Sequence, residues 1–127
     1  MGLTEGIERT HEFRVEGDLL TDVGGTLPLA VLSTPGMISM MEWAATALVR
    51  DELPFGHATV GFEVCIKHVG GALEGADCTV RARLRQVIDE RKLRFDVEVR
   101  EGDRVIGVGT HERRVIDVTE HASAAGA

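Results

Sequence analysis

Several kinds of residue are scarce in this sequence. The 127 residues include no tyrosine, one tryptophan, three prolines and two cysteines. No apolar run reaches the roughly 18 residues that a membrane-spanning helix needs, so no contact with membrane is expected. Basic residues are also few: 14 lysines and arginines stand against 21 aspartates and glutamates, giving a formal charge of −7. This excludes nucleic acid or an anionic membrane as the default partner and favours a small molecule or another protein.

The length and composition fit one globular domain. Hydrophobic residues make up 43% of the chain and charged residues 28%, which excludes collagen-like and disordered classes. We expect a single domain over residues 1–127 with its core at about 10–118, and a frayed tail at 121–127. The acidic start, Met1 to Glu8, is unlike a secretory signal, so a cytoplasmic protein is expected.

The cysteines and histidines give no sign of a metal site. Cys65 and Cys78 fall in segments expected to be neighbouring strands, which would permit a disulfide in an oxidising compartment, but we favour two reduced, buried thiols. No C-x-x-C motif is present, and His111-Glu112 continues as Arg-Arg-Val, which lacks the second histidine of a zinc helix. Neither a metal nor a cofactor is expected.

The second half of the chain alternates apolar and polar residues, as half-buried strands do. Strands are expected at about 59–68, 80–84, 93–100 and 104–116, the last interrupted by Gly107 and Gly109. In the first of them Val60, Phe62, Val64 and Ile66 are expected to share one face. Turn residues at 70–75, 89–90 and 101–103 join consecutive strands, which predicts an antiparallel meander.

One segment before these strands has helical character. Residues 35–50 are apolar at most positions, Pro35 suits a first helical position, and Thr34 is expected to be the N-cap. A short strand near His11–Val15 and a glycine-rich connection at 17–26 come first.

A helix that is apolar almost all round must be covered almost all round, and one sheet covers only one side of it. The order of strand, helix and four long strands resembles the hotdog fold, an α+β fold in which a five-stranded antiparallel sheet wraps a central helix. A second copy would cover the exposed side and hide an edge strand, so a homodimer is expected.

Three residues stand out as candidates for chemistry. Glu42 lies with Ser39 and Thr46 on a narrow polar stripe of the helix, either as a solvated face or as a functional carboxylate. His68 ends a strand beside Gly70-Gly71, where it is either a structural group or within reach of substrate. Thr34 is explained as a cap, yet a helix N-terminus also offers amides to an oxyanion, here near Gly36.

Other polar groups have simpler explanations. Arg81, Arg83 and Arg85 are expected on the sheet surface, with attraction of a ligand's phosphates as the alternative. The Gly107-Val108-Gly109 stretch lacks the strand-to-helix context of a dinucleotide loop.

Three blocks of sequence resemble the fluoroacetyl-CoA thioesterase family of hotdog hydrolases. They are Thr34-Pro-Gly-Met-Ile-Ser-Met-Met-Glu-Trp-Ala44, Cys65-Ile-Lys-His68 and Gly109-Thr-His-Glu-Arg113, and the likeness covers about residues 10–118. The resemblance implies that Thr34, Glu42 and His68 are catalytic and that Gly61 and Arg113 contact substrate.

The resemblance also bears on the substrate. A phenylalanine-bearing lid precedes the helix in the family enzyme, but residues 19–32 contain no aromatic side chain here. We therefore expect hydrolysis of a short-chain acyl-CoA rather than strict fluoroacetyl selectivity. A non-catalytic acyl-CoA or hydrophobic-ligand binding protein is the alternative, as is an enoyl-CoA hydratase, although its Asp-to-His strand motif is not found.

The spacing of the candidates sets a geometric condition. Thr34 and Glu42 are eight positions apart, about 12 Å along an ideal helix. Either Thr34 lies in a loop that folds back, or the site combines residues of two subunits. His68 is expected to act as general base toward water or Thr34, with Glu42 positioning the base or the water, or attacking the carbonyl itself.

Overall fold

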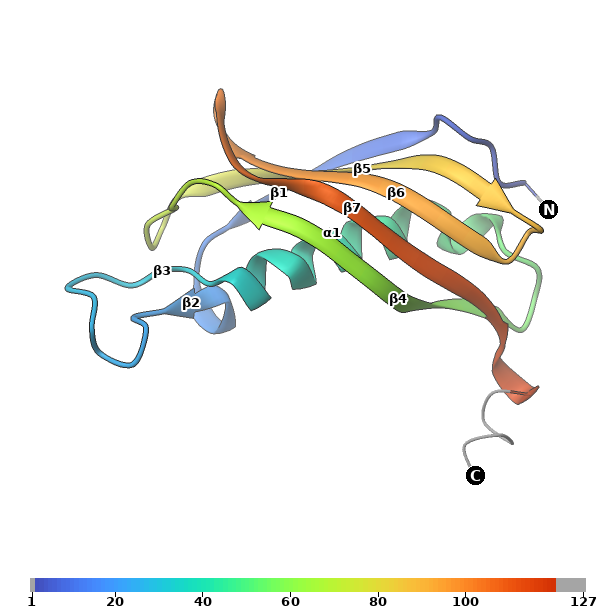
Figure 1. Cartoon of the computed structure of the whole chain (residues 1–127), viewed down its shortest axis with the longest axis horizontal. Coiled ribbons are helices and arrows are strands. Elements are labelled where there is room, and N and C mark those ends of the chain that lie inside the picture. The colour runs from blue at the N-terminus through green and yellow to red at the C-terminus, as the bar shows by residue number, and fades with distance from the viewer. Residues whose placement is uncertain (1, 121–127) are drawn as a thin grey trace.

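The computed structural model of the chain describes residues 2–120, and the expected fraying of residues 121–127 lies outside this range. The elements in order are β1 (Glu8–Arg14), the 3-10 turn η1 (Gly17–Leu19), β2 (Leu20–Thr21), β3 (Val31–Leu32), α1 (Thr34–Val49), the 3-10 turn η2 (Arg50–Glu52), β4 (His57–His68), β5 (Asp77–Ile88), β6 (Lys92–Glu101) and β7 (Arg104–Asp117). Figure 1 shows the result, an α+β fold in which α1 runs along one face of a twisted antiparallel sheet.

The large sheet has the strand order β1-β5-β6-β7-β4, and every neighbouring pair is antiparallel. The expected meander is confirmed for β5, β6 and β7. It is wrong for β4, which does not pair with β5 but crosses to the far edge and pairs with β7. The long connection at 69–76 makes this crossing possible.

This topology corrects the expectation for the cysteines. Cys65 lies in β4 and Cys78 in β5, and β6 and β7 separate these two strands. Adjacent strands are about 4.8 Å apart, so the two thiols of one chain are far beyond disulfide reach. Cys78 is buried as expected, and burial raises the pKa of its thiol, whereas Cys65 is exposed.

The helix begins one residue earlier than expected because Ser33, not Thr34, is its N-cap. The Ser33 Oγ accepts a hydrogen bond from the Gly36 amide at 2.9 Å, and Pro35 follows in the first turn. Thr34 is therefore the first helical residue, and its hydroxyl is not used in capping. The helix ends at Val49, where Arg50 starts the 3-10 turn.

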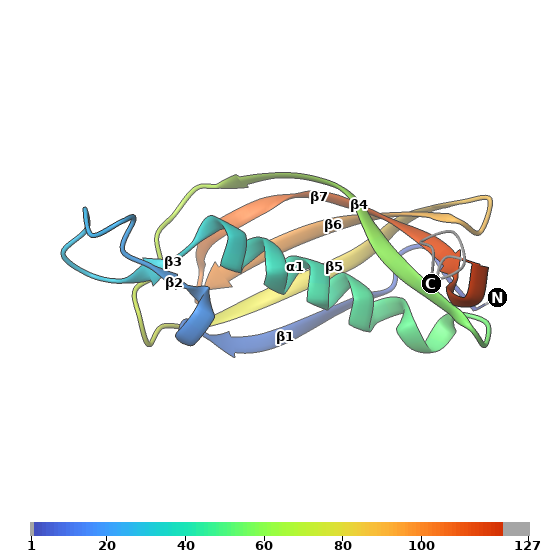
Figure 2. The same cartoon turned by 90° about the horizontal axis from the view of Figure 1, so that it is seen from below.

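The core lies between α1 and the concave face of the sheet (Figure 2). Met37, Met41, Ala44, Ala45 and Val49 of the helix are buried against the inward residues of β5 and β6, of which Phe95 is the largest. The other side of α1 is only partly covered: Trp43 is 48% exposed and contacts His11 edge to face, with ring centroids 4.5 Å apart. One sheet thus covers one side of the helix.

A β-bulge interrupts β4 between Gly61 and Glu63. Val60 pairs with Arg114, whereas Val64 pairs with His111, which faces the core. Because one extra residue reverses the alternation, the expected common face of Val60, Phe62, Val64 and Ile66 is wrong. Phe62 lies on the outer side under the Arg114 guanidinium, 3.6 Å from the ring centroid, while Ile66 and His68 follow Val64.

The pairing of β4 with β7 also depends on Gly109. A Cβ on this residue would collide with the Cys65 carbonyl oxygen and lie 2.6 Å from the Ile66 Cα. Glycine is required here because the two backbones approach too closely for any side chain, which explains the irregular alternation of the last strand.

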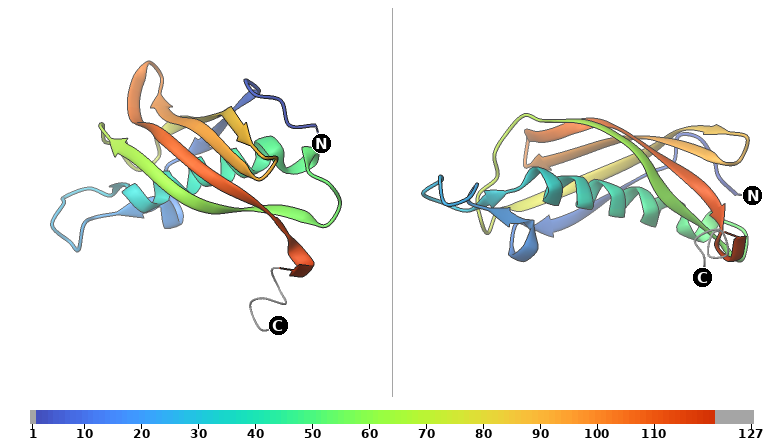
Figure 3. Two further views of the ribbon diagram at one scale, coloured as in Figure 1. Left: turned by 45° about the vertical axis from the view of Figure 1, so that its right-hand side comes forward. Right: turned by 60° about the horizontal axis from the view of Figure 1, so that its bottom comes forward.

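The two edges of the sheet are formed by β4 and β1 (Figure 3), and their side chains differ in character. The β4 edge is 12 residues long and exposes Val60, Phe62 and Val64 at 36%, 59% and 39%. The β1 edge is 7 residues long, and charged side chains occupy most of its exposed positions. Long apolar edges invite pairing with another strand, whereas charged edges discourage it.

The segment before the helix forms a small antiparallel hairpin of β2 and β3 beyond the N-terminus of α1 (Figure 2). Its loop at 22–30 is largely exposed. Within residues 2–120, no helix is both long and apolar enough to cross a bilayer.

Candidate active site

Thr34 and His68 meet at the N-terminal end of α1. The Thr34 Oγ1 lies 2.8 Å from the His68 Nδ1, within hydrogen-bond reach. His68 is the last residue of β4, and Thr34 can contact it because Ser33 has taken the capping role. A hydroxyl in contact with an imidazole is the arrangement that activates either the hydroxyl or a water as nucleophile.

The amides of the first helical turn are largely occupied. The Gly36 amide donates to the Ser33 Oγ and the Met37 amide to the Ser33 carbonyl oxygen, both at 2.9 Å. Pro35 has no amide proton. Contact of Gly36 with substrate stays a prediction, and substrate would have to displace the cap to use that amide.

Glu42 lies about two turns further along the helix and is not a freely solvated residue. Its side chain is 40% exposed, and its Oε2 is 3.4 Å from the Arg113 Nη1 and 4.0 Å from the His111 Nε2. The other members of the stripe bond to the helix itself: Ser39 Oγ donates to the Gly36 carbonyl and Thr46 Oγ1 to the Glu42 carbonyl. Glu42, by contrast, reaches charged and polar side chains of the sheet.

Gly61 makes the room that Glu42 occupies. A Cβ at this position would lie 2.7 Å from the Glu42 Oε2 and 3.5 Å from the Arg113 Nη1. Gly61 also pairs with Arg113 across β4 and β7. The residue that the resemblance assigned to substrate contact thus forms one wall of the carboxylate site.

Arg113 is held from two sides. Its Nε donates to the Thr59 Oγ1 at 2.8 Å and its Nη2 to the Thr59 carbonyl at 3.0 Å, while Nη1 faces Glu42. The side chain is 9% exposed; burial lowers the pKa of Arg113, and the charge and hydrogen bond of Glu42 oppose that effect. In this structure Arg113 orients Glu42, and its contact with substrate stays a prediction.

His111 belongs to the same group, although the sequence drew attention to it only as half of a zinc motif. Its Nδ1 lies 2.8 Å from the Glu63 carbonyl oxygen and its Nε2 3.2 Å from the Arg113 Nη1. Alternation along β7 was the available signal, since residues two apart on a strand share a face.

The chain therefore contains two clusters. The first is Thr34 with His68; the second is Glu42 with Gly61, His111 and Arg113. Because Thr34 lies inside the helix, no folded-back loop brings it to Glu42. Among residues 2–120, no three His, Cys, Asp or Glu side chains gather in a way that could hold a metal ion.

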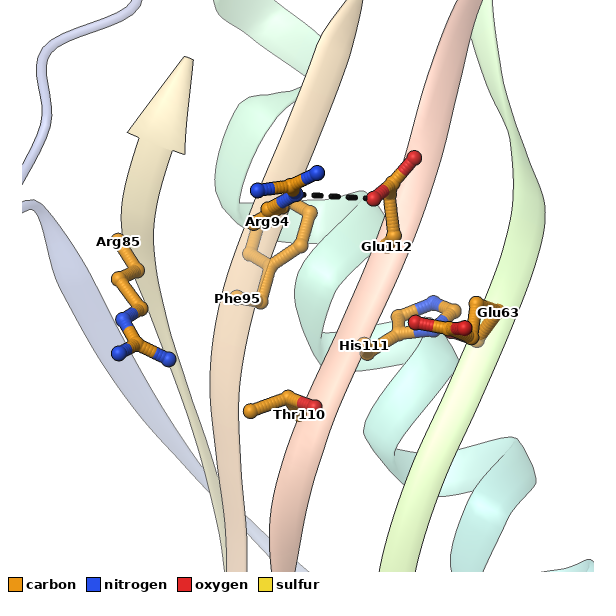
Figure 4. Close-up of a pocket in the computed structure, with 7 residues that line it drawn as sticks. All are labelled: Glu63, Arg85, Arg94, Phe95, Thr110, His111 and Glu112. Atoms are coloured by element: carbon orange, nitrogen blue, oxygen red, sulfur yellow. Dashed lines mark hydrogen bonds and ion pairs between the residues drawn. The ribbon is translucent and has the colours of Figure 1, made fainter. Parts of the chain in front are cut away.

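A shallow pocket lies on the outer face of the sheet (Figure 4), where Arg85, Arg94 and Glu112 are among the lining residues. The Arg94 Nε donates to Glu112 at 3.0 Å, and together with Arg114 it holds the pKa of Glu112 below its usual range. Arg85 pairs with Asp96 at 3.6 Å.

Arg81, which belongs to the same outer face, pairs with Glu8 at 3.3 Å. These ion pairs are consistent with the simpler explanation of the outward arginines as sheet surface.

The sheet wrapped on a central helix, with candidate polar groups at the helix N-terminus and on its inner face, places the chain in the hotdog class of thioesterase-like folds. A hypothetical protein from Thermus thermophilus, described as a thioesterase superfamily member, is 25% identical with a TM-score of 0.85, covering 95% of this chain and 89% of that one. A model of the family described as fluoroacetyl-CoA-specific thioesterase matches residues 15–119, and the chain belongs to this family.

Individual relatives agree with this assignment. The structure of the fluoroacetyl-CoA thioesterase FlK is 29% identical with a TM-score of 0.87, covering 98% of this chain and 96% of that one. A fluoroacetyl-CoA thioesterase of Streptantibioticus cattleyicolor is 37% identical over 86 residues. That alignment spans 68% of this chain and 61% of the relative's length.

Proposed function

We propose that the protein is a cytoplasmic acyl-CoA thioesterase that hydrolyses a short-chain acyl-CoA to the carboxylic acid and free CoA. The contact between the Thr34 hydroxyl and the His68 imidazole, at 2.8 Å, is the observation that carries the proposal. Membership of the fluoroacetyl-CoA-specific thioesterase family supports it. Without an aromatic side chain in residues 19–32, the acyl group is not restricted to fluoroacetyl.

In the proposed reaction, His68 takes a proton from water or from Thr34, and the resulting oxygen nucleophile attacks the thioester carbonyl. The C–S bond breaks, the sulfur leaves as thiolate and takes up the proton, and a carboxylic acid remains. If Thr34 or Glu42 attacks first, the acyl group stays on that side chain as an ester or an anhydride, and a water then hydrolyses it to the carboxylic acid. Glu42, kept close to Arg113, orients the water or attacks the carbonyl itself. The reaction needs neither a metal nor a cofactor.

The site is proposed to be completed by a second copy of the chain. Antiparallel pairing of two β4 edges about a two-fold axis at Cys65 places Val64 of one copy opposite Ile66 of the other. With the bulge at Phe62, Gly61 then lies opposite His68 of the second copy and on the same face. Since Glu42 sits against Gly61, this pairing brings Glu42 of one copy to the Thr34–His68 pair of the other.

The apolar character of the β4 edge supports this homodimer. Val60, Phe62 and Val64 are exposed in the single chain, and the partly uncovered Trp43 adds to the apolar surface. Two symmetric active sites per dimer follow.

The proposed register of the two β4 edges predicts that the Cys65 residues of the two copies lie close together. Its two copies face each other on the axis, at a Cα separation of about 4.5–5.5 Å, which a disulfide accepts. Mild oxidation is expected to give a covalent dimer, detected by non-reducing electrophoresis. Cys65→Ser is expected to abolish the crosslink, and Cys78→Ser, which removes a buried thiol, to leave it intact. A dimer in solution without crosslinking would show that this register is wrong.

The proposed activity is tested by thiol release from acetyl-, propionyl-, butyryl- and fluoroacetyl-CoA. We expect catalytic release of CoA from several of these esters. Saturable binding of the same esters without thiol release would replace the proposal with a non-catalytic acyl-CoA binding protein.

A further inference from the structure

We infer that His111 is a positioning residue for Glu42, and that it acts through the guanidinium of Arg113. The inference rests on the proposed function, because it gives Glu42 a task in hydrolysis. His111 is not expected to touch the substrate: its side chain is 1% exposed and it lies beneath Glu42 and Arg113.

The hydrogen bonds of His111 fix its tautomer. A backbone carbonyl oxygen only accepts, so the Nδ1 that lies 2.8 Å from the Glu63 oxygen must carry a proton. In the neutral ring the Nε2 is then an acceptor. It faces the Arg113 Nη1 at 3.2 Å, and an arginine nitrogen only donates.

The surroundings of His111 favour this neutral form. Burial is the largest influence and lowers the pKa of His111, with the charge of Arg113 acting in the same direction. The Glu63 carbonyl on β4 and the Glu42 carboxylate on α1 act in the opposite direction. From β6 the ring is stacked on Phe95, with centroids 6.2 Å apart, which adds no charge.

His111 thereby completes the orientation of Arg113. Thr59 fixes the Nε and Nη2 side of the guanidinium, and His111 provides an acceptor for Nη1, the same nitrogen that faces the Glu42 Oε2 at 3.4 Å. Without the Nε2 acceptor, Nη1 is anchored only by Glu42, whose side chain is 40% exposed and able to move. A misplaced catalytic carboxylate lowers turnover without changing how the rest of the substrate binds.

Two amide substitutions separate the two hydrogen bonds. His111→Asn keeps a donor near the position of Nδ1 for the Glu63 carbonyl but is too short to reach Arg113. His111→Gln can place an oxygen near the position of Nε2 and so accept from Arg113. We expect Asn to lower kcat about 10- to 100-fold with KM within about 2-fold, and Gln to recover most of that loss.

Equal losses in the two variants, or losses that follow their thermal stabilities, would overturn the inference in favour of a purely structural role. Glu42→Gln, assayed beside them, distinguishes the catalytic role of Glu42 from the positioning role of His111. If Glu42→Gln stays active, the proposed catalytic site fails. If Glu42→Gln is inactive while His111→Asn is as active as wild type, the role of His111 alone fails.

A second measurement does not depend on activity. The ring ¹⁵N shifts of His111 in wild-type protein near neutral pH are expected to report a neutral imidazole with the proton on Nδ1. A proton on Nε2, or a charged ring, would contradict the proposed acceptance from Arg113.

Discussion

Glu42→Gln is expected to lower kcat for thioester hydrolysis by about 10²- to 10⁴-fold, the range that general acid–base groups contribute. Glutamine has nearly the same shape, and its amide oxygen can still accept from Arg113, which is 3.4 Å from the carboxylate. It cannot act as a base or a nucleophile. The measurement is single-turnover and steady-state CoA release, with circular dichroism to confirm folding.

The control is Glu12→Gln, which makes the same chemical change at an exposed position of β1, at the opposite edge of the sheet from β4. It is expected to keep near-wild-type turnover. If the two variants have similar activity, Glu42 is not catalytic.

Mixing subunits extends this result. In a random mixture of Glu42→Gln and His68→Ala chains, half of the dimers contain one chain of each kind. A site that combines His68 of one copy with Glu42 of the other is then intact once in each mixed dimer. The mixture is expected to regain about one quarter of wild-type activity. No recovery above the separate variants, in a mixture shown to contain mixed dimers, would place all three residues in one chain's site.

The largest expected effect on stability comes from Phe95→Ala. Phe95 is the largest fully buried side chain, at 0% exposure, and it also supports the ring of His111. Its removal is expected to lower the free energy of unfolding by about 3–5 kcal/mol, which corresponds to a fall in Tm of about 10–20 °C. Denaturant and thermal unfolding measure both quantities.

Phe55→Ala is the matched control, because Phe55 is fully exposed at 103%. It should change stability by less than about 0.5 kcal/mol. If it costs as much as Phe95→Ala, the assignment of the core between α1 and β6 is wrong.

The elements themselves could be predicted from the sequence because their signals are local. Alternation marks β5, β6 and β7, and the apolar run after Pro35 marks α1. The partner of β4 could not be predicted in this way, since pairing with β7 joins residues about 50 positions apart. The turn residues after β4 indicated only that the chain reverses, not which strand it meets.

The wrong N-cap and the wrong face of the β4 residues have a shared cause: each depends on a shift of one residue that the local sequence does not reveal. Ser33 and Thr34 are both good caps, and only the backbone geometry selects Ser33. The bulge at Phe62 likewise adds one residue that no local pattern announces, and it reverses the faces of Val60 and Val64.

The sequence predicted one contact of the candidate site, that of Thr34 with His68, but not those of Glu42. Thr34 does contact His68, whereas Glu42 contacts Arg113 and lies near His111 rather than His68. Burial and hydrogen bonding of His111 arise only when β4, β6 and β7 come together, so alternation along β7 could place His111 on the face of Arg113 but could not predict its contacts.

The contrast between the apolar β4 edge and the charged β1 edge limits the size of the proposed assembly. If two chains pair through β4, as proposed, the β4 edges of both chains are used in the pairing. The two β1 edges then remain exposed at the ends of the joined sheet. Charged edge strands of this kind do not readily pair with further strands. The proposed dimer is therefore not expected to grow into open filaments, even at high concentration.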